Sequence, residues 1–451
     1  VPVYTKPKVG IVSTGDELVR PGSDLKPGQI YDVNSFSTGA AVEDAGGEPM
    51  IYEHAGDDYD EMENTLRRAT EECDVVLSSG STSASAVDVV YRVIEEKGEL
   101  LLHGIAVKPG KPTIFGRLEG TSYIGLPGNP ISALTVFNLF ASRVIRDAAG
   151  LPETPSSEVV EAKIASHIPS ETGRTRLLPV GLVESPERGL LTYSLDKGSG
   201  ATTSLSEADG YVVVDQDVNY LEEDEEVNVN LLGKDVKPPA VFGAGGGCPA
   251  VNRLLEDTHS RWLNVGSVEG ARKLREGITD VAGVNLSVEY LSDLGIENAR
   301  LVRGYERHVG LIVEKGNPEG YESLEGALKT EGSFGARPRG SGTRVLLESL
   351  LEERGLSLEE FDTLTFRSQD GVANAVESGK IKTGLGIKYV ARKHGLGFVP
   401  LLWENYDFLV AEDRASKDGV KSLIEDLDEF DLKDLEGYKR SEETGDVVKK
   451  W

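Results

Sequence analysis

The stretch VKPGKPTIFGRLEGTSYIGLPGNPIS, residues 107–132, combines a rigid turn, a strand and the start of a helix. Its first part places Lys108 and Lys111 on either side of a Pro-Gly turn, whose backbone has little freedom. Two ammonium groups directed toward one point are expected to bind an oxyanion. The second part contains an apolar strand over residues 123–126, and Asn129 followed by proline predicts that a helix begins there. Free N–H groups at a helix start also favour an anion.

Strands and helices alternate upstream of this stretch. Residues 8–13 and 74–78 have the apolar composition of buried strands, and residues 33–45 and 60–72 have the composition of helices. Alternation of this kind predicts a mainly parallel sheet covered by helices on both faces. In such sheets, ligands bind beyond the carboxyl ends of the strands. The fold expected for residues 1–150 is therefore α/β.

Polar and small residues follow two of these strands. Asp16 follows the first strand, and a run of small residues at 80–85 follows the second. Small residues allow backbone N–H groups to approach a phosphate or a heterocycle, although a flexible loop has the same composition. Asp88 lies where a carboxylate would hold Mg²⁺ against a phosphate, and an aspartate that interacts with a helix dipole is an equal alternative.

Four motifs follow one another along this region. They are STGDEL at 13–18, SSGSTSASAVD at 78–88, KPGKP at 108–112 and LPGNPIS at 126–132. Their order and spacing resemble the catalytic domain of the MoeA/gephyrin family, the molybdopterin molybdenumtransferases. The resemblance implies an enzyme of molybdenum cofactor biosynthesis. It would insert molybdate, or tungstate, into adenylylated molybdopterin and release AMP with the assistance of Mg²⁺.

The same resemblance implies roles for individual residues. Asp16, Asp88, Lys108 and Lys111 would be the catalytic groups; the two aspartates would also hold the metal, and the two lysines would hold the molybdate. The residues implied in substrate binding are Ser79, Gly80, Ser81, Thr82, Ser83, Gly128, Asn129 and Ser132.

Short β-rich segments come next in the chain. They cover residues 159–164, 176–180, 211–214 and 227–232. Their spacing predicts a small, mostly antiparallel sheet or barrel within residues 151–235, which resembles the C-terminal β-domain of the same family. Arg174 and Ser199 are expected to complete the molybdate site, because a guanidinium group suits a tetrahedral oxyanion. The residues alone fit ordinary surface turns equally well.

A third α/β pattern begins after a charged, proline-containing linker. Its motifs are GSVEGARKLREGITDVAGVNL at 266–286, GLIVEKGNPEG at 310–320, ARPRGSGTR at 336–344 and TGLGIKYVARKHGLGFVPL at 383–401. They resemble the periplasmic-binding-protein-like domain that is fused to MoeA in some archaea and bacteria, which implies two lobes and a ligand cleft over residues 241–440. Residues 425–450 are highly charged and are expected to form a surface helix or a fraying tail.

The turn Ser341-Gly342-Thr343-Arg344 precedes a predicted helix in this third domain. Hydroxyl groups beside free helix N–H groups form an oxyanion cradle, although the same residues also make an ordinary N-cap. We expect these four residues to contact the ligand of the third domain.

The composition limits the partners. A formal net charge of −28 argues against nucleic acid or an anionic membrane, since both repel such a surface. The chain has no run of about 18 apolar residues and no visible export signal, so a cytoplasmic location is expected. Cys73 and Cys248 imply no disulfide framework, and the six histidines show no zinc-ligand spacing.

The resemblance implies further partners and leaves two functions to compare. Family members form homodimers in which upstream domains complete the active site, and those domains are not in this sequence, so we expect the activity to depend on them. Other proteins of molybdenum cofactor biosynthesis are possible partners, besides the small-molecule substrates. The alternative to the transferase is a non-catalytic oxyanion or pterin sensor that uses the binding-protein-like domain.

Overall fold

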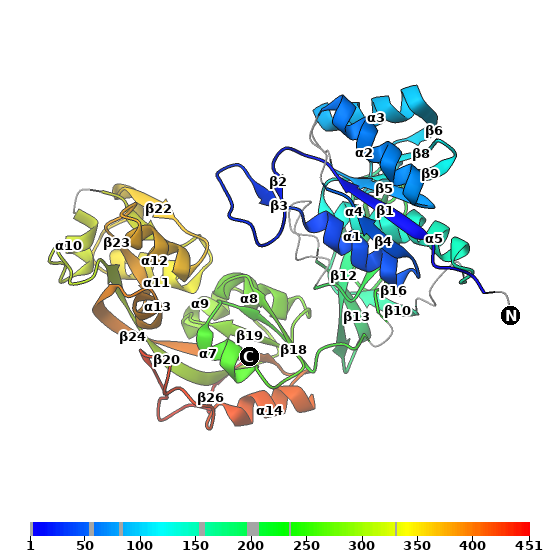
Figure 1. The fold of residues 1–451 in the computed structure, drawn as a ribbon. Coiled ribbons are helices and arrows are strands. Elements are labelled where there is room, and N and C mark those ends of the chain that lie inside the picture. The colour runs from blue at the N-terminus through cyan, green and yellow to red at the C-terminus, as the bar shows by residue number, and fades with distance from the viewer. Residues whose placement is uncertain are drawn as a thin grey trace. The chain divides into compact units, whose positions relative to one another are not determined.

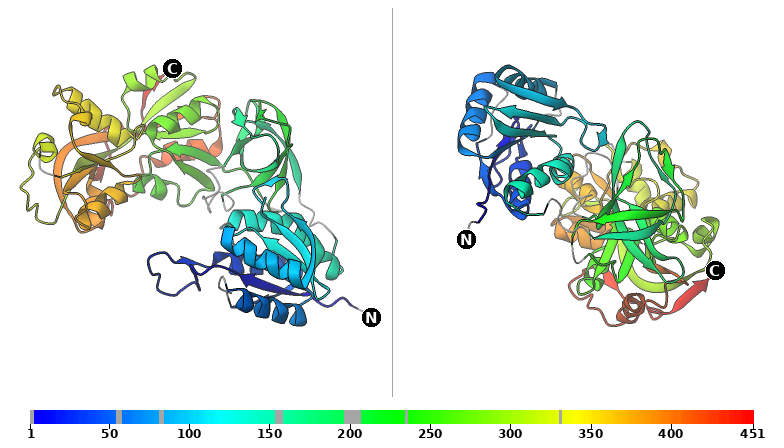
Figure 2. Two further views of the ribbon diagram at one scale, coloured as in Figure 1. Left: turned by 90° about the horizontal axis from the view of Figure 1, so that it is seen from above. Right: turned by 90° about the vertical axis from the view of Figure 1, so that its right-hand side faces the viewer.

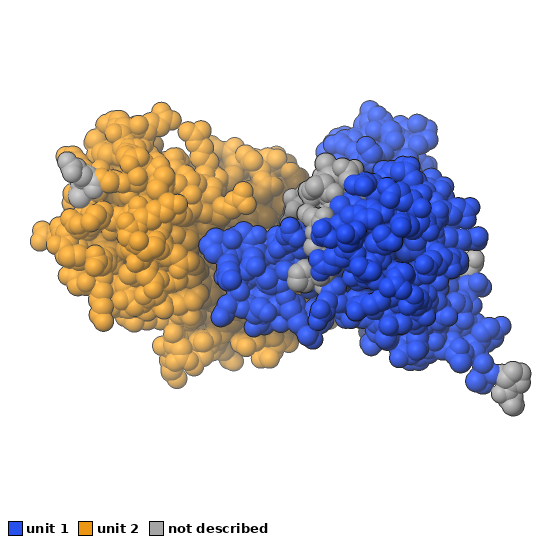
Figure 3. All heavy atoms as spheres, turned by 45° about the horizontal axis from the view of Figure 1, so that its top comes forward, with its two compact units in different colours: residues 1–181, 192–237 blue, residues 182–191, 238–451 orange. Residues whose placement is uncertain are grey.

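The computed structural model describes residues 3–53, 58–80, 84–152, 158–195, 207–233, 236–329 and 332–451. The chain forms two compact units, which Figure 3 shows in different colours. Unit 1 consists of residues 1–181 and 192–237, and unit 2 consists of residues 182–191 and 238–451. Both units mix helices and strands, which confirms the predicted α/β fold class. No helix in the described parts of the chain is long and apolar enough to cross a bilayer.

The first part of unit 1 is a six-stranded sheet in the order β4-β1-β5-β9-β8-β6. Its strands are β1 (Lys8–Ser13), β4 (Glu48–Ile51), β5 (Val75–Ser79), β6 (Gly98–His103), β8 (Ile114–Leu118) and β9 (Thr121–Leu126). The strands β4, β1, β5 and β9 are parallel to one another, whereas β8 runs antiparallel to both of its neighbours, β9 and β6. A short pair, β2 (Leu18–Val19) and β3 (Ile30–Tyr31), lies outside this sheet.

Helices cover both faces of this sheet (Figure 1). They are α1 (Val33–Asp44), α2 (Tyr59–Glu72), α3 (Ala84–Lys97), α4 (Pro130–Val136) and α5 (Ser142–Ala148), with a π-helical turn, Phe137–Ala141, between the last two. Side chains alternate between the faces of a strand. Ile11 and Leu77 accordingly pack with α1, α4 and α5, whereas Val12 and Val76 pack with α2 and α3. Two apolar layers therefore fix the sheet between the helices.

The second part of unit 1 is a small β-barrel, visible in Figure 2. Its strands are β10 (Val159–Ile164), β12 (Thr175–Ser185), β13 (Gly189–Ser194), β14 (Gly210–Val214) and β16 (Glu226–Leu231), with a minor pair, β11 (Ile168–Pro169) and β15 (Tyr220–Leu221). The order is β13-β10-β16-β14-β12, and pairing of β13 with β12 closes the ring. A two-residue strand from the first part, β7 (Val107–Lys108), adds to β12 in parallel. The lysine segment is thereby fixed against the barrel.

Unit 2 contains a ten-stranded sheet along the path β18-β17-β19-β24-β20-β23-β21-β22. The strands are β17 (Val241–Gly245), β18 (Ser260–Asn264), β19 (Val281–Val284), β20 (Ala299–Val313), β21 (Phe334–Ala336), β22 (Thr363–Thr365), β23 (Thr383–Ile387) and β24 (Gly397–Ala411). The helices are α7 (Pro249–Leu254), α8 (Ser267–Arg275), α9 (Val288–Asp293), α10 (Leu324–Lys329), α11 (Gly342–Glu352), α12 (Gln369–Glu377), α13 (Lys388–Lys393) and α14 (Asp418–Asp426), with a 3₁₀ turn at Leu358–Glu360.

The long strands β20 and β24 run through two lobes of unit 2 (Figure 1). One lobe contains α7, α8, α9 and the strands β17 to β19, and the other contains α10 to α13 and the strands β21 to β23. The C-terminal segment does not fray as the sequence suggested. Two further strands, β25 (Tyr438–Lys439) and β26 (Val447–Lys450), pair with β20, and the N–H of Trp451 donates to Ala299 O at 2.9 Å. Backbone pairing and packing of the Trp451 ring hold this segment despite its charge.

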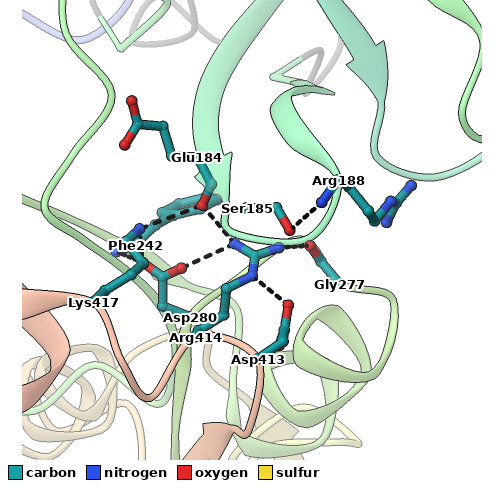
Figure 4. A network of polar contacts seen from close by, with 9 residues as sticks. All are labelled: Glu184, Ser185, Arg188, Phe242, Gly277, Asp280, Asp413, Arg414 and Lys417. Atoms are coloured by element: carbon teal, nitrogen blue, oxygen red, sulfur yellow. Dashed lines mark hydrogen bonds and ion pairs between the residues drawn. The ribbon is translucent and has the colours of Figure 1, made fainter.

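Residues 182–191, the hairpin that joins β12 to β13, belong to unit 2 through a buried polar network. Figure 4 shows the guanidinium of Arg414 at the centre of this network. Only 1% of the Arg414 surface is exposed to solvent. Arg414 donates to Asp280 Oδ1 at 3.0 Å and to the carbonyl oxygens of Glu184 and Gly277, each at 2.9 Å. Lys417 Nζ lies 2.8 Å from Asp280 Oδ2. A fully buried carboxylate thus has two cationic partners, and both cations also contact the hairpin backbone, because Lys417 Nζ lies 3.5 Å from the carbonyl oxygen of Glu184.

Candidate functional site

The first candidate site lies at the carboxyl ends of three adjacent parallel strands in unit 1. Register places Ser13 of β1 opposite Ser79 of β5, and Ser79 opposite Leu126 of β9. The Thr14 N–H donates to Ser79 O at 2.8 Å, and Ser79 Oγ lies 3.5 Å from Pro127 O. The structure therefore brings together the segments after the three strands, which the sequence separates widely.

Gly80 shows why this edge needs a residue without a side chain. Its φ is +144°, and a Cβ placed on it would lie 2.0 Å from Thr14 Oγ1. Substitution would thus strain the backbone and displace the Thr14 side chain. Ser81, Thr82 and Ser83 lie outside the described residues. Asp88 belongs to α3, but its side chain is also outside the described part.

Two buried polar atoms at this edge have no hydrogen-bond partner among the described residues. They are Thr14 Oγ1 and Asn34 Oδ1. Asn34 uses its amide nitrogen to donate to Gly128 O at 2.7 Å. A buried polar group without a partner costs roughly 1–3 kcal/mol, so both atoms are suited to an incoming ligand. Sequence reasoning missed both residues, although Thr14 lies within the quoted STGDEL motif.

The segment that follows β1 is ordered by local hydrogen bonds. Asp32 caps α1, where its Oδ1 accepts from the N–H of Ser35 at 3.0 Å. The same carboxylate oxygen accepts from Ser13 Oγ at 2.9 Å. Asp16 is exposed between these elements, and no group of three metal-ligating side chains occurs in the described residues. Mg²⁺ commonly uses only one or two protein carboxylates together with substrate phosphates, so Asp16 is a chemically suitable ligand.

The lysine segment meets the barrel through the pairing of β7 with β12. Val107 lies opposite Thr175, and Lys108 lies opposite Arg176. This register brings Lys108 close to Arg174, 66 positions later in the chain. The two cations share one carboxylate oxygen: Glu171 Oε2 lies 2.8 Å from Lys108 Nζ and 3.8 Å from Arg174 Nη2.

Glu171 is a residue that sequence reasoning missed. The hydrogen bond from Lys108 holds the pKa of this carboxyl below its usual range, with a smaller effect from Arg174. Lys108, Glu171 and Arg174 all remain accessible to solvent. The position of Glu171 Oε2 therefore marks a point at which two cations already converge on one negative oxygen.

The other predicted oxyanion ligands differ in their surroundings. Lys111 is exposed, and its ammonium has no partner within the described residues. Ser132 is buried in α4, and the expected free N–H groups at this helix start are partly occupied. Asn129 Oδ1 accepts from the N–H of Ile131 at 3.1 Å and from the N–H of Ser132 at 3.3 Å. Asn129 therefore caps the helix itself, and Ser199 lies outside the described residues.

A second candidate site lies in unit 2, where both lobes line a cavity of about 720 Å³. Ser341, Gly342 and Thr343 line it, as does Arg337. Arg344 does not line the cavity, because it points along α11 and its Nε lies 2.6 Å from Glu348 Oε1. Three of the four residues expected at the third-domain site therefore reach the cavity.

Comparison with known families matches three consecutive parts of the chain. Residues 10–147 match the family described as "Probable molybdopterin binding domain", and residues 161–232 match the "MoeA C-terminal region (domain IV)". Residues 250–428 match the "PBP superfamily domain". The chain thus combines a region similar to a molybdopterin binding domain, a region similar to the MoeA C-terminal region and a region similar to the PBP superfamily domain. This confirms the resemblance found in the sequence, and both sides of the Lys108–Glu171–Arg174 cluster lie in matched domains.

Individual relatives are named as enzymes of molybdopterin metabolism. Molybdopterin molybdenumtransferase 2 of Mycobacterium tuberculosis is 40% identical over 161 residues, covering 34% of this chain and 39% of that protein. The molybdopterin molybdenumtransferase of Bacillus subtilis is 30% identical over 238 residues, covering 52% of this chain and 55% of that protein. A crystal structure of the molybdopterin biosynthesis MoeA protein from Pyrococcus horikosii has 41% identity and a TM-score of 0.45, covering 51% of this chain and 55% of that chain. The chain spans between 39% and 55% of the length of these two curated relatives.

Proposed function

We propose that unit 1 is a molybdopterin molybdenumtransferase module that inserts molybdate into adenylylated molybdopterin and releases AMP. The observation that carries this proposal is the convergence of Lys108 and Arg174, from two matched domains, on one carboxylate oxygen. A dianionic tetrahedral oxyanion offers the same two cations more charge than a carboxylate does. The names of the relatives favour this enzyme over the non-catalytic sensing alternative.

In this proposal the described residues act mainly by binding and orientation. Lys108, Arg174 and Lys111 concentrate molybdate, with Ser132 and Ser199 as neighbouring ligands. The edge formed by Ser79, Gly80, Gly128 and Asn129, together with the 81–83 loop, receives the phosphate end of the pterin substrate. The unpartnered hydroxyl of Thr14 supplies a donor or acceptor at the same edge. Holding two substrates in register removes much of the entropic barrier, and fixed charges stabilise the developing charge.

Mg²⁺ belongs to this proposal through its chemistry with phosphates. Asp16 and Asp88 would hold it, and Asp16 is an exposed carboxylate beyond the end of β1 that can share the ion with a bound phosphate. The ion would neutralise charge on the adenylyl phosphate when bound. The role of the protein side chains is to present carboxylate oxygens at the same edge that receives the pterin phosphate.

The wider assignments remain part of the same proposal. They are three domains at residues 1–150, 151–235 and 241–440, a homodimer, contact with other proteins of cofactor biosynthesis, a cytoplasmic location, and tungstate as an alternative to molybdate. The third domain would bind a ligand at the turn that contains Ser341, Gly342 and Thr343. That function is supported by the cavity that these residues line.

The direct test is AMP release from adenylylated molybdopterin, measured with and without molybdate, using the chain together with the upstream domains of a relative. We expect molybdate-dependent AMP release that Lys108→Met lowers at least tenfold, because an ammonium at the oxyanion is lost. Glu222→Gln, a change of an exposed acidic residue on the barrel, provides a control with unchanged release. Equal AMP release from the wild-type and Lys108→Met proteins would remove the proposed role of the cation pair.

A further inference from the structure

The cavity in unit 2 is built from both lobes. The first lobe contributes residues 246–249 and 264–267, and the second contributes residues 337–339, 341–343 and 367–370 together with part of α13. The long helices α8, α11 and α12 each begin at this cavity. Ser341 and Ser368 cap α11 and α12, but helix N-termini still carry partial positive charge, so the walls favour a negative ligand.

The size of the cavity is not a consequence of separated lobes. The N–H of Val268 in the first lobe donates to Gly340 O of the second lobe at 3.2 Å. Gly342 also lies directly against Asn285, because a Cβ on this glycine would come within 1.7 Å of Asn285 Oδ1. The lobes therefore touch while about 720 Å³ remains between them.

This volume is too large for a bare tetrahedral oxyanion. Such an anion has five heavy atoms and occupies on the order of 100–150 Å³, if each atom is given roughly the volume of a water molecule. Cavities of about 300–1,000 Å³ instead suit organic ligands. The walls also include apolar and aromatic side chains, among them Pro249, Val265, Ile387 and Tyr389. An organic body has surfaces to contact here that a hydrated oxyanion would leave unused.

Arg337 is the charged group that makes the cavity selective. Within the described parts of the chain its guanidinium has no carboxylate partner, and its buried Nε has no hydrogen-bond partner at all. Its one hydrogen bond runs from Nη2 to the carbonyl oxygen of Arg367 at 2.7 Å. Burial and the nearby charge of Arg307 lower the pKa of Arg337 to about 10. Keeping a positive charge here is costly unless an anion compensates it.

Three other cations at the cavity have acidic partners, and a further one, Arg367, lines the cavity but is exposed to solvent. Arg307 Nε lies 2.6 Å from Glu404 Oε1, and Lys393 Nζ lies 2.7 Å from Asp370 Oδ1. Arg339 lies 3.3 Å from Glu359 at the exposed rim. Arg337 therefore stands apart as a partly buried cation in a chain whose formal net charge is −28.

Polar groups beside α11 add donors and acceptors to the same cavity. Thr343 and Gln369 are both buried, and Gln369 Nε2 donates to Thr343 Oγ1 at 3.0 Å. The Gln369 Oε1 atom has no partner among the described residues. Because its oxygen accepts from Gln369, the Thr343 hydroxyl retains its proton for donation to a ligand.

We propose that this cavity binds an organic anion, meaning a carboxylate or phosphate group carried on an organic body, rather than a free inorganic oxyanion. The anionic group binds Arg337 and the Thr343 hydroxyl, and the body packs on the apolar wall that includes Val265 and Tyr389. This assignment specifies the ligand class of the third domain, and it does not depend on the transferase activity of unit 1. Failure of one proposal therefore leaves the other intact.

The test uses the full chain and a defined panel of probes. Organic carboxylates and phosphate monoesters are compared with their neutral amides and alcohols, and with molybdate, tungstate, sulfate and phosphate, by thermal shift and then calorimetry. We expect organic anions to bind, neutral analogues to fail, and Arg337→Gln to weaken the best ligand at least tenfold, because a charge-assisted hydrogen bond is lost.

Two controls separate this result from a general loss of structure. Arg344→Gln removes a neighbouring arginine that does not line the cavity, and it should keep wild-type affinity. Circular dichroism verifies that Arg337→Gln is folded, and Thr343→Val offers a second variant, which removes the other proposed donor to the anionic group and should also weaken binding. The proposal is overturned if no organic anion of the panel binds, if the inorganic oxyanions bind as tightly, or if the folded Arg337→Gln protein binds like wild type.

Discussion

The buried network around Arg414 offers the sharpest test of how unit 2 is held together. Replacing Arg414 with Met keeps an unbranched side chain but removes the guanidinium. Asp280 then keeps only Lys417 as a cationic partner, the carbonyl oxygen of Gly277 loses its donor, and that of Glu184 keeps only the longer 3.5 Å contact with Lys417 Nζ. Removing one member of a buried ion pair costs about 3–5 kcal/mol, and the lost hydrogen bonds to carbonyls are part of that loss. Because Lys417 remains, we expect a value of about 3–4 kcal/mol.

The assay can follow unit 2 selectively. All three tryptophans, Trp262, Trp403 and Trp451, belong to unit 2, so fluorescence during urea unfolding reports on that unit. With a slope of roughly 2–3 kcal/mol per molar urea, the expected loss lowers the fluorescence midpoint by about 1–2 M. Far-UV circular dichroism should retain the transition of unit 1, because its residues take no part in this network.

Glu184 supplies a matched control for this experiment. Only its backbone carbonyl contacts Arg414, and its side chain is exposed and points away from the guanidinium (Figure 4). Glu184→Ala should therefore leave the fluorescence midpoint within about 0.3 M of wild type, as most surface substitutions do. If Arg414→Met shifted the midpoint no more than Glu184→Ala does, the network would contribute nothing to stability and the reasoning would be refuted.

Three further predictions concern the sites and the pH dependence. Glu171→Gln removes the negative charge shared by Lys108 and Arg174, so the affinity for molybdate, measured by calorimetry, should rise about two- to fivefold. An unchanged affinity would contradict the idea that the Glu171 carboxylate occupies the position of the oxyanion. Thr14→Val deletes a buried hydroxyl that has no partner among the described residues, so the urea midpoint should stay near that of wild type. The affinity for adenylylated molybdopterin should fall about tenfold. An unchanged affinity would show that the hydroxyl does not contact this substrate. Burial raises the pKa of Asp407 to about 6, so its contribution to the free energy of unfolding is complete below pH 4, and up to about 3 kcal/mol of it is lost as the pH rises to 6. The urea midpoint of wild type, measured relative to that of Asp407→Asn, should therefore fall over that range. A constant difference between the two proteins would exclude this titration.

Local sequence patterns predicted the elements of unit 1 closely because local chemistry determines where they begin and end. The predicted strand at residues 8–13 is β1, and the Asn129-Pro130 pair begins α4 with Asn129 as its cap. The same pair also shows a limit of local reasoning. The cap oxygen occupies two of the N–H groups that were expected to receive an anion. A good N-cap and an open anion site compete for the same donors.

Residues whose role depends on distant pairing were beyond the reach of sequence patterns. Glu171 lies 63 positions from Lys108, and only the register of β7 with β12 brings the two together. Arg337 was not predicted as a ligand residue. The Ser-Gly-Thr turn that follows it has a recognisable pattern, whereas no local pattern tells which arginine lacks an acidic partner. The sequence prediction named Arg344 instead, yet Glu348 one helical turn later pairs with it.

The proposed oxyanion site of unit 1 therefore depends on a strand of only two residues. The strand β7 carries Lys108, and its pairing with Thr175 and Arg176 determines how far the lysine lies from Arg174 and Glu171. A shift of one residue in this register would move Lys108 by about 3.3 Å and turn its side chain to the other face of the sheet. A charge-assisted hydrogen bond requires about 2.7–2.9 Å between its donor and acceptor atoms. Such a shift would therefore break the bond from Lys108 to Glu171 and separate Lys108 from Arg174. Correct closure of the barrel is thus a condition for the proposed oxyanion site.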